Sequence, residues 1–182
     1  MNKLMIKLVI GSEAIFFIAL IISYLYCRQA FGFDPEAARY LDARKTGGYT
    51  LLLLASSGSF ALAQRACLRA RLGRFRLWMV VTLLMGGLFL AGQLREYGDL
   101  LGRHVTMGGS AFGSSFYTLT GFHALHVVIG LLALFILLLI TRRGGLADGK
   151  STAPAAIGLY WHFVDVVWLF VFFTIYLLPR IV

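Results

Sequence analysis

The sequence predicts an all-α, polytopic transmembrane bundle of five helices, forming a single transmembrane domain over residues 1–182. Of the 182 residues, 59% are hydrophobic and the mean hydropathy is +0.81, which exceeds what a soluble domain usually shows. Five apolar segments each approach the roughly 20 residues that a helix needs to cross a bilayer. The Lys and Arg residues lie mainly between these segments, so they indicate topology and not a nucleic-acid surface.

The five predicted helices follow one another along the whole chain. They span about residues 4–27, 49–68, 77–94, 111–140 and 156–178. The longest connection, 28–48, contains Asp34-Pro35 as a turn signal and EAARYLDAR, residues 36–44, as a short surface helix. Because no small-residue cleavage site follows the first segment, we expect that segment to stay in the mature protein.

The positive charges predict the orientation of the bundle, since cytoplasmic connections carry the excess of Lys and Arg. The amino terminus and the second and fourth connections together hold ten positive residues and one acid, whereas the opposite side holds seven and five. We therefore expect a cytoplasmic N-terminus and a periplasmic C-terminus. The stretch RACLRARLGRFR follows the same rule, and no nucleic acid is expected as a partner.

The first helix contains a costly residue, Glu13, in GSEAIFFIAL. It lies about nine residues into the helix, roughly 13 Å deep at about 1.5 Å per residue. An ionised acid near the bilayer centre costs about 2.5 to 3.5 kcal/mol on insertion scales. Glu13 must therefore be protonated, hydrogen-bonded, or facing protein or water. Both a proton-linked carboxyl and a structural hydrogen bond between helices are consistent with this.

The second and third helices give simpler patterns. Small residues in the second helix predict close helix packing with little chemistry; they are Ala55, Ser56, Ser57, Gly58, Ser59 and Ala61.

The third helix ends in GQLREYGDL, which places Gln93, Glu96 and Tyr97 as interfacial residues at its outer end. We expect an ion pair there between Glu96 and Arg95 or Arg103.

The fourth and fifth helices each carry a polar pair at i, i+3 spacing, which places the two side chains near one side of a helix. The pairs are His123 with His126, in GSSFYTLTGFHALHVVIG, and His162 with Asp165, in YWHFVDVVWLFVFF. Because buried ionisable groups in lipid need partners, we expect these two helices to face one another.

These polar pairs admit two kinds of role. Neutral imidazole suits iron, copper and zinc, but apart from His162 no further Cys or His completes a ligand set for His123 and His126, so hydrogen bonding between helices is favoured. His162 and Asp165 could form an orienting pair in a proton relay. Trp161 and Trp168 share a stripe with Asp165, as on a helix packed against other protein, and are predicted to be interfacial.

These motifs resemble subunit III of the haem–copper respiratory oxidases, the cytochrome c oxidase subunit 3 family. The matching segments run through nearly the whole chain: SEAIFF, LLLLASSG, GQLREY, GSSFYTLTGFHALHVVIG and YWHFVDVVWLFVFFTIY. In this resemblance Glu13 corresponds to the membrane-embedded carboxyl of the SExxFF motif. His123 and His126 correspond to the GFHxLHV histidines, and His162 and Asp165 to the WHFVDVVW pair. Because the SExxFF helix comes first, we expect the short five-helix bacterial form.

The resemblance implies a non-catalytic subunit of a cytochrome c oxidase-type translocase in the bacterial inner membrane. It implies no catalytic residue, cofactor or metal in this chain, with the haems and copper in partner subunits. Expected partners are subunit I by direct packing, subunit II, other small subunits of the complex, and membrane lipids, including bound phospholipid. In this role the chain would stabilise subunit I and support proton uptake during reduction of O2 to water.

Two alternatives stay open. One is subunit III of a quinol oxidase, or a homologue associated with nitric oxide reductase, which changes the electron donor but not the role of the subunit. Phe122 before the first histidine of GFHALHV favours the cytochrome c type. The other is an independent membrane haem protein or carrier that uses the histidine pairs as ligands.

Overall fold

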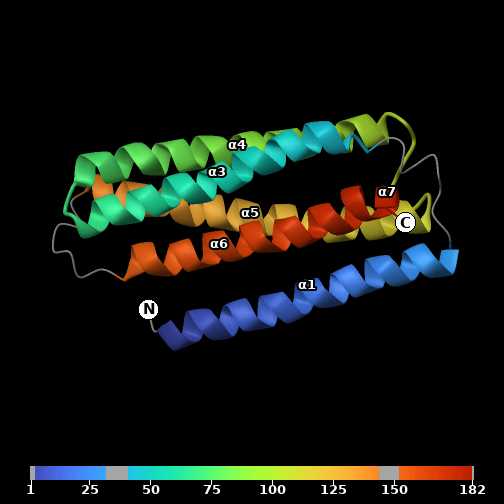
Figure 1. The fold of residues 1–182 in the computed structure, drawn as a ribbon, viewed down its shortest axis with the longest axis horizontal. Helices are drawn as coiled ribbons and strands as arrows, with labels where there is room; N and C mark the ends of the chain where they lie inside the picture. The colour runs from blue at the N-terminus through green and yellow to red at the C-terminus, as the bar shows by residue number, and fades with distance from the viewer. Residues whose placement is uncertain (1–2, 32–40, 144–151, 182) are drawn as a thin grey trace.

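The computed structural model describes residues 3–31, 41–143 and 152–181, and within these ranges all regular secondary structure is helical (Figure 1). In chain order the elements are α1 (Lys3–Phe31), α3 (Ala43–Leu68), α4 (Leu72–Leu101), α5 (Ala111–Arg142), α6 (Ala153–Phe172), the π-helical turn η1 (Phe173–Leu177) and α7 (Leu178–Ile181). Five helical spans in the described residues are long and apolar enough to cross a membrane, with Ala153–Arg180 counted as one. The predicted all-α fold with five membrane-spanning helices is confirmed.

The helices extend beyond the apolar segments from which they were predicted. α3 begins at Ala43, where the apolar pattern begins near residue 49, and α4 covers Leu72–Leu101, where the pattern marks 77–94. Hydropathy marks only the part that lies in hydrocarbon, whereas backbone hydrogen bonding continues through the polar ends. Most of the predicted surface helix at 36–44 lies outside the described residues, and its last two positions form the start of α3.

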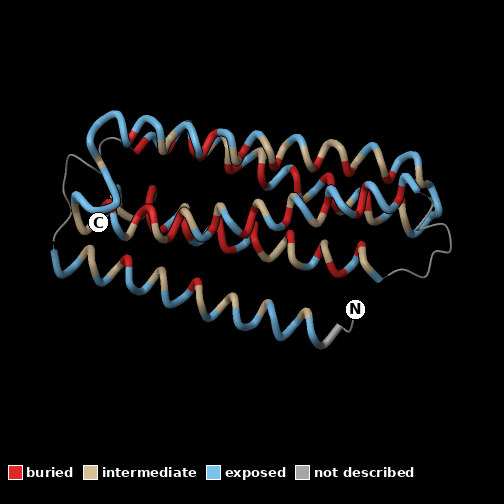
Figure 2. The backbone as a smooth tube through the Cα atoms, turned by 180° about the vertical axis from the view of Figure 1, so that it is seen from behind, coloured by how far each residue is buried: buried red, intermediate tan, exposed pale blue. Residues whose placement is uncertain are grey.

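Four of the helices form a closed bundle and the fifth lies outside it. α3 packs along α4, α4 against α5, α5 against α6, and α6 returns to α3. α1 lies against α5 and α6, and Figure 2 shows that most of its length is exposed or only partly buried. The buried side chains among its described residues are Phe17 and Tyr24. The expected packing of the fourth and fifth predicted helices, α5 and α6, against each other is therefore observed.

Two connections reverse the chain with the same backbone motif. After α3, the N–H of Ala70 donates to Cys67 O and the N–H of Arg71 to Ala66 O, and Ala70 has a φ of 52°. After α4, His104 has a φ of 62° and occupies the equivalent position. This is the Schellman arrangement, in which a residue in left-handed conformation ends the helix.

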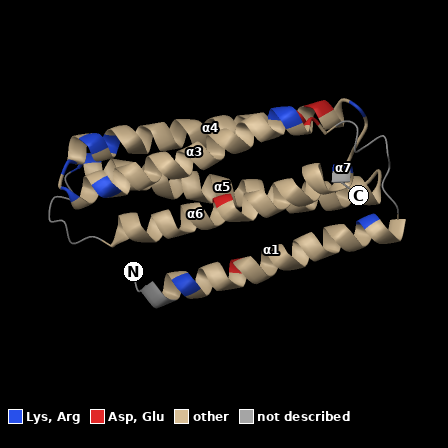
Figure 3. Cartoon of the chain, viewed as in Figure 1, with Lys and Arg blue, Asp and Glu red and all other residues tan. Residues whose placement is uncertain are grey.

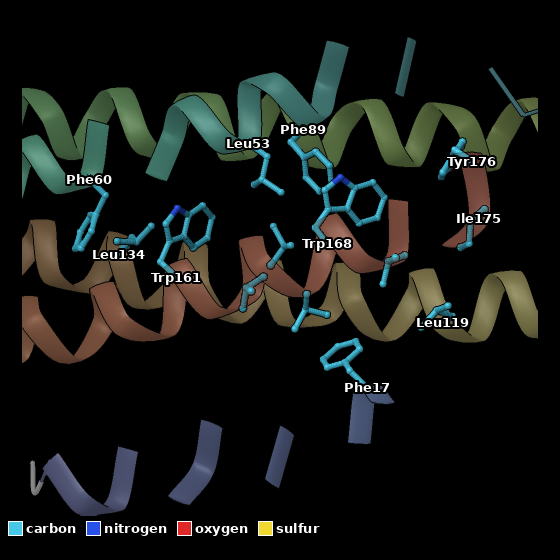
Figure 4. Close-up of a cluster of buried hydrophobic side chains, with 14 of the residues drawn as sticks. Phe17, Leu53, Phe60, Phe89, Leu119, Leu134, Trp161, Trp168, Ile175 and Tyr176 are labelled. Carbon is cyan, nitrogen blue, oxygen red and sulfur yellow. The ribbon is translucent and has the colours of Figure 1, made fainter. Parts of the chain in front are cut away.

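The bundle core is centred on two tryptophans of α6 (Figure 4). Trp161 and Trp168 are both fully buried. The ring of Trp168 meets Phe89 of α4 edge-on, with centroids 4.8 Å apart. Both tryptophans therefore lie at the contact between helices of this chain.

The charged residues are distributed unevenly between the two ends of the bundle. Figure 3 shows Lys and Arg gathered at the α3–α4 connection, whereas the opposite end carries Asp or Glu as well. This pattern agrees with the positive charges counted along the sequence. Which end faces the cytoplasm stays a prediction.

Asp42 caps the start of α3, just outside the membrane-spanning segment. Its Oδ1 accepts hydrogen bonds from the backbone N–H groups of Lys45 and Arg44 at 3.2 and 3.1 Å, and Lys45 Nζ lies 3.5 Å from Oδ2. The backbone hydrogen bond from Lys45, followed by that from Arg44 and the Lys45 charge, lowers the pKa of Asp42 below its usual range. An aspartate at this position is among the most favourable N-caps.

We expect this cap to weaken in acid. Because the folded-state pKa is lowered, the stabilisation by the cap is complete above the unfolded-state pKa of about 3.9. This stabilisation is lost as the pH falls through the lower, folded-state pKa. Hydrogen-exchange protection at Arg44 and Lys45 should therefore fall between about pH 5 and pH 2. Asp42→Asn, which caps without a titrating group, should give a flat profile. A flat profile in the unaltered protein would contradict the prediction.

Candidate functional site

Glu13 of α1 and His126 of α5 form a direct contact between two helices. Glu13 Oε2 lies 3.0 Å from His126 Nε2, and their side chains are 32% and 11% exposed. The carboxyl that the sequence places deep in the first helix is thus hydrogen-bonded to an imidazole, which removes most of the cost of an isolated acid in lipid.

The second nitrogen of His126 decides how protons are arranged in this contact. His126 Nδ1 lies 2.7 Å from the carbonyl oxygen of Phe122, one turn earlier in α5. Because a carbonyl oxygen only accepts, Nδ1 must carry a proton. The Nε2–Oε2 hydrogen bond then holds one proton, either on Glu13 with a neutral imidazole or on the imidazole with an ionised Glu13. Both arrangements have zero net charge, so the contact is a site at which one proton can move between two groups.

Aromatic rings surround this pair. Phe17 meets the His126 ring edge-on at a centroid distance of 4.9 Å, and Phe16 packs edge-on against Phe122 at 5.1 Å. Tyr160 of α6 donates a hydrogen bond from its hydroxyl to the backbone oxygen of His126 at 3.2 Å. The pair therefore sits where α1, α5 and α6 meet, with an apolar shell that strengthens the hydrogen bond.

His123, one turn before His126, has a different environment. It is completely buried, and among the described residues neither of its ring nitrogens has a hydrogen-bond partner. Its ring lies 4.8 Å from that of Trp168 and 6.2 Å from those of Phe17 and Phe89, measured between centroids. The two histidines thus have different neighbours, although they lie near one side of the helix. His126 contacts Glu13 of α1, and His123 lies in the core. In the described contacts His123 meets neither His162 nor Asp165, although the two helices pack against each other as predicted.

We expect His123→Phe to leave the protein at least as stable as before. A buried polar group without a partner costs about 1–3 kcal/mol, and phenylalanine removes this cost while keeping an aromatic ring among aromatic neighbours. The check is the thermal midpoint of the detergent-solubilised protein. A midpoint lowered by several degrees would mean that the imidazole makes a stabilising polar contact.

The second polar pair, on α6, is held by α3. Ser57 Oγ donates a hydrogen bond to Asp165 Oδ2 and lies 2.8 Å from His162 Nδ1. Asp165 is 2% exposed, and its Oδ1 has no partner among the described residues. His162 and Asp165 are therefore linked through the hydroxyl of Ser57, one of the small residues that the sequence predicts to serve close helix packing.

Hydrogen bonds to α6 continue along the length of α3. Trp161 Nε1 donates to Ser56 Oγ at 3.2 Å, and Trp168 Nε1 donates to Thr50 Oγ1 at 2.9 Å. At the other end of the interface, Gln64 Nε2 donates to the backbone oxygen of Pro154 at 2.9 Å. The small residues of α3 thus allow close approach and also supply the acceptors that the α6 side chains need.

Glu96 lies in a third polar cluster, near the end of the bundle where α3 begins and α4 ends. Its carboxylate accepts hydrogen bonds from Tyr176 at 2.7 Å, and from Gln93 and Thr46 at 3.1 Å each. Tyr97 donates separately to Thr120 at 2.7 Å. The described hydrogen-bond donors to this carboxyl are hydroxyl and amide groups, and the ion pair with Arg95 or Arg103 stays a prediction.

The π-helical turn η1 supplies the tyrosine of this cluster. Residues Phe173–Leu177 adopt the wider turn, and within it Tyr176 is buried with its hydroxyl on Glu96. Such turns shift the side chains that follow them and occur frequently at functional sites. The apolar pattern of the fifth predicted helix contains no sign of this turn.

No group of three or more His, Cys, Asp or Glu side chains that could hold a metal ion occurs in the described parts of the chain. The fold and these contacts define a polytopic membrane protein in which two acids of the membrane-spanning helices, Glu13 and Asp165, form hydrogen bonds with side chains of neighbouring helices.

Comparison with known proteins identifies the family. The family model described as cytochrome c oxidase subunit III matches residues 2–179. A protein named "Probable cytochrome c oxidase subunit 3" from Nocardia farcinica is 39% identical over 92% of this chain and 83% of its own length. "Cytochrome c oxidase subunit 3" of Bacillus subtilis is 34% identical over 96% and 84%, and that of Synechocystis is 36% identical over 95% and 74%. The chain belongs to the cytochrome c oxidase subunit III family.

Proposed function

We propose that this chain is a non-catalytic subunit III of a proton-pumping haem–copper terminal oxidase in the bacterial inner membrane. It packs directly against subunit I, assembles with subunit II and smaller subunits, and supports proton uptake while the complex reduces O2 to water. The haems and copper belong to the partner subunits. Cytochrome c is the proposed electron donor, supported by the names of the relatives and by the GFHALHV motif.

The observation that carries this proposal is the Glu13–His126 contact. It joins α1 to α5 by a hydrogen bond of 3.0 Å that holds one transferable proton at membrane depth. A carboxyl with such a partner can pass its proton to the imidazole and take it back without changing the net charge of the pair. This chemistry fits a subunit that assists proton movement without a redox centre.

The test of this role uses Glu13→Gln in the assembled oxidase. Glutamine can donate to His126 Nε2 and so keeps the link between the helices, but it has no proton to exchange. We expect unchanged haem content and thermal stability, with proton uptake slowed and the number of turnovers before inactivation reduced several-fold. Glu13→Ala should show the same kinetic change together with lower stability.

The adjacent Ser12→Ala is the matched control, because the Ser12 hydroxyl bonds only to the backbone oxygen of Val9 in its own helix, at 2.8 Å, among the contacts of the described residues. It should match the unaltered oxidase in every measurement. Unchanged uptake and inactivation kinetics in Glu13→Gln would reduce Glu13 to a packing residue.

Two other functions make different predictions for the purified complex. A quinol oxidase subunit would co-purify with an enzyme that oxidises quinol and not reduced cytochrome c. An independent haem protein or carrier would show bis-histidine haem absorption in the isolated chain, whereas we expect that chain to be colourless.

A further inference from the structure

Ser57 of α3 joins His162 and Asp165 of α6 in a second polar contact between helices, separate from that of Glu13 with His126. Ser57 Oγ donates a hydrogen bond to Asp165 Oδ2 and lies 2.8 Å from His162 Nδ1. The serine hydroxyl is therefore the middle member of a chain of three groups that runs from an imidazole to a carboxyl.

The order of the three groups decides what they can do. In a serine hydrolase the histidine lies between the serine and the acid, and it removes the proton of a hydroxyl that then attacks the substrate. Here the serine lies between His162 and Asp165, and its proton is directed at the carboxyl. The arrangement therefore suits the passage of a proton through the hydroxyl and not a nucleophilic attack by it.

The hydrogen bonds allow one proton to cross this chain. A hydroxyl donates one proton and accepts through its lone pairs, so when Ser57 donates to Asp165, His162 Nδ1 carries a proton and donates it to Ser57. A further proton taken up at Nε2 makes the imidazole positive. The Nδ1 proton can then move to Oγ while the Oγ proton moves to Oδ2. This leaves a neutral imidazole, an intact hydroxyl and a protonated carboxyl.

The two ends of the chain have different surroundings. His162 is half-buried, and it shares a helix face with Leu159 and Val166, which are 45% and 50% exposed. Asp165 is buried, and its Oδ1 has no hydrogen-bond partner among the described residues. An ionised carboxylate is costly in such a position, because hydrocarbon offers no donor to the second oxygen. A proton that enters at the surface of α6 thus reaches a carboxyl that gains from holding it.

The other helices packed against α6 bring no competing partner to the chain in the described contacts. On α5, the ring of His123 lies against Trp168, 4.8 Å away between centroids. On α1, Glu13 is hydrogen-bonded to His126, and Tyr160 of α6 donates to the backbone oxygen of His126. The titratable groups nearest to α6 are thus engaged elsewhere, and Ser57 is the described link between His162 and Asp165.

We propose that His162, Ser57 and Asp165 form a proton relay, which takes up a proton at His162 Nε2 and holds it on Asp165. The imidazole is the entry point, the hydroxyl carries the proton between helices, and the carboxyl is the binding site. The proposal does not rest on Glu13, because the relay holds its proton even if Glu13 only links α1 to α5.

The test follows the infrared absorption of the protonated Asp165 carboxyl in the detergent-purified oxidase complex. The pH is lowered rapidly from about 8 to about 5, the range in which an ordinary imidazole takes up a proton, and the band is identified by its absence in Asp165→Asn. We expect the band to rise in the unaltered complex and to rise about 100-fold more slowly in His162→Asn, the lower end of what a positioned proton-transfer group contributes. Asparagine can keep a hydrogen bond to Ser57 but carries no proton, so a purely structural role of His162 would leave the rate unchanged.

The matched control is His104→Asn, which removes an imidazole from the connection after α4. Asparagine tolerates the positive φ of 62° at that position better than most residues do, and the rate should stay the same. Ser57→Thr keeps the hydroxyl and should retain most of the rate, whereas Ser57→Ala should be as slow as His162→Asn.

The unaltered complex gives a measurement that does not depend on assembly of the His162 and Ser57 variants. Because two protons move together, the rate should fall along a curve, and not a straight line, as D2O replaces H2O. A straight line would overturn passage through the hydroxyl, and an equal rate in His162→Asn would overturn the entry point. An Asp165 band that is absent at both pH values, or equally large at both, would overturn proton uptake by Asp165. Failure of the role proposed for Glu13 is distinguishable, because Glu13→Gln should leave the rise of the Asp165 band unchanged.

Discussion

Gly130→Ala is expected to destabilise the protein by about 1–3 kcal/mol, the usual cost of inserting a methyl group into a packed core. A Cβ at Gly130 would lie 2.7 and 2.8 Å from Cε3 and Cζ3 of the Trp161 ring. The ring has little room to move away, because Gly86 of α4 approaches its other edge, where a Cβ would be 3.0 Å from Cη2. Trp161 is therefore clamped between glycines of two helices, and either the ring or α5 must shift.

The measurement is the thermal midpoint of the detergent-solubilised protein, together with recovery of the assembled complex. Gly87→Ala is the control, because a Cβ at that position has no atom within 4 Å, and Gly87 directly follows Gly86 in the same helix. We expect no loss of stability in Gly87→Ala. An equal loss in both variants would mean that the effect comes from the glycine backbone and not from the Trp161 contact.

A second variant isolates the contact itself. Trp161→Phe removes the six-membered part of the indole, which carries Cε3 and Cζ3, but it also leaves a cavity and removes the hydrogen bond to Ser56. If the clash is the cause, the combination with Gly130→Ala should be less destabilised than the sum of the two single changes, by more than about 0.5 kcal/mol. Strict additivity would argue against a direct contact.

The sequence predicts the helices well because lipid imposes a simple rule on them. A segment of about 20 apolar residues has no alternative to a helix or a closed barrel in hydrocarbon. The same rule predicts that Glu13 has a partner, and the structure gives it one in His126. What the pattern does not contain is the rotation of each helix about its axis, which decides the partner of each polar side chain.

That rotation explains which contacts between polar side chains the sequence does not predict. The sequence predicts that the two helices with polar pairs face one another, and they do, yet the described partner of His162 and Asp165 is Ser57 of α3. The available signal was the serine run of α3, a set of hydroxyls within an apolar helix. Tyr176 had no such signal, because a π-helical turn moves it out of the register that a regular helix predicts.

Ser57→Ala is expected to cost about 1–3 kcal/mol, because it leaves the buried carboxyl of Asp165 without the hydrogen bond that Ser57 donates. Among the described residues Oδ1 of Asp165 already lacks a partner, so the change leaves the whole carboxyl unsatisfied. The half-buried His162 loses its contact with Ser57 as well. The thermal midpoint should fall, and α6 should become more accessible to hydrogen exchange at the His162 turn.

The decisive comparison is the double variant Ser57→Ala with Asp165→Leu. Leucine has nearly the shape of aspartate, and replacing both members of a buried hydrogen bond by apolar groups of similar shape is close to neutral. We therefore expect the double variant to recover most of the stability that Ser57→Ala loses. If it is instead less stable than Ser57→Ala, then Asp165 makes a favourable interaction of its own, and its carboxyl stabilises the bundle independently of the serine.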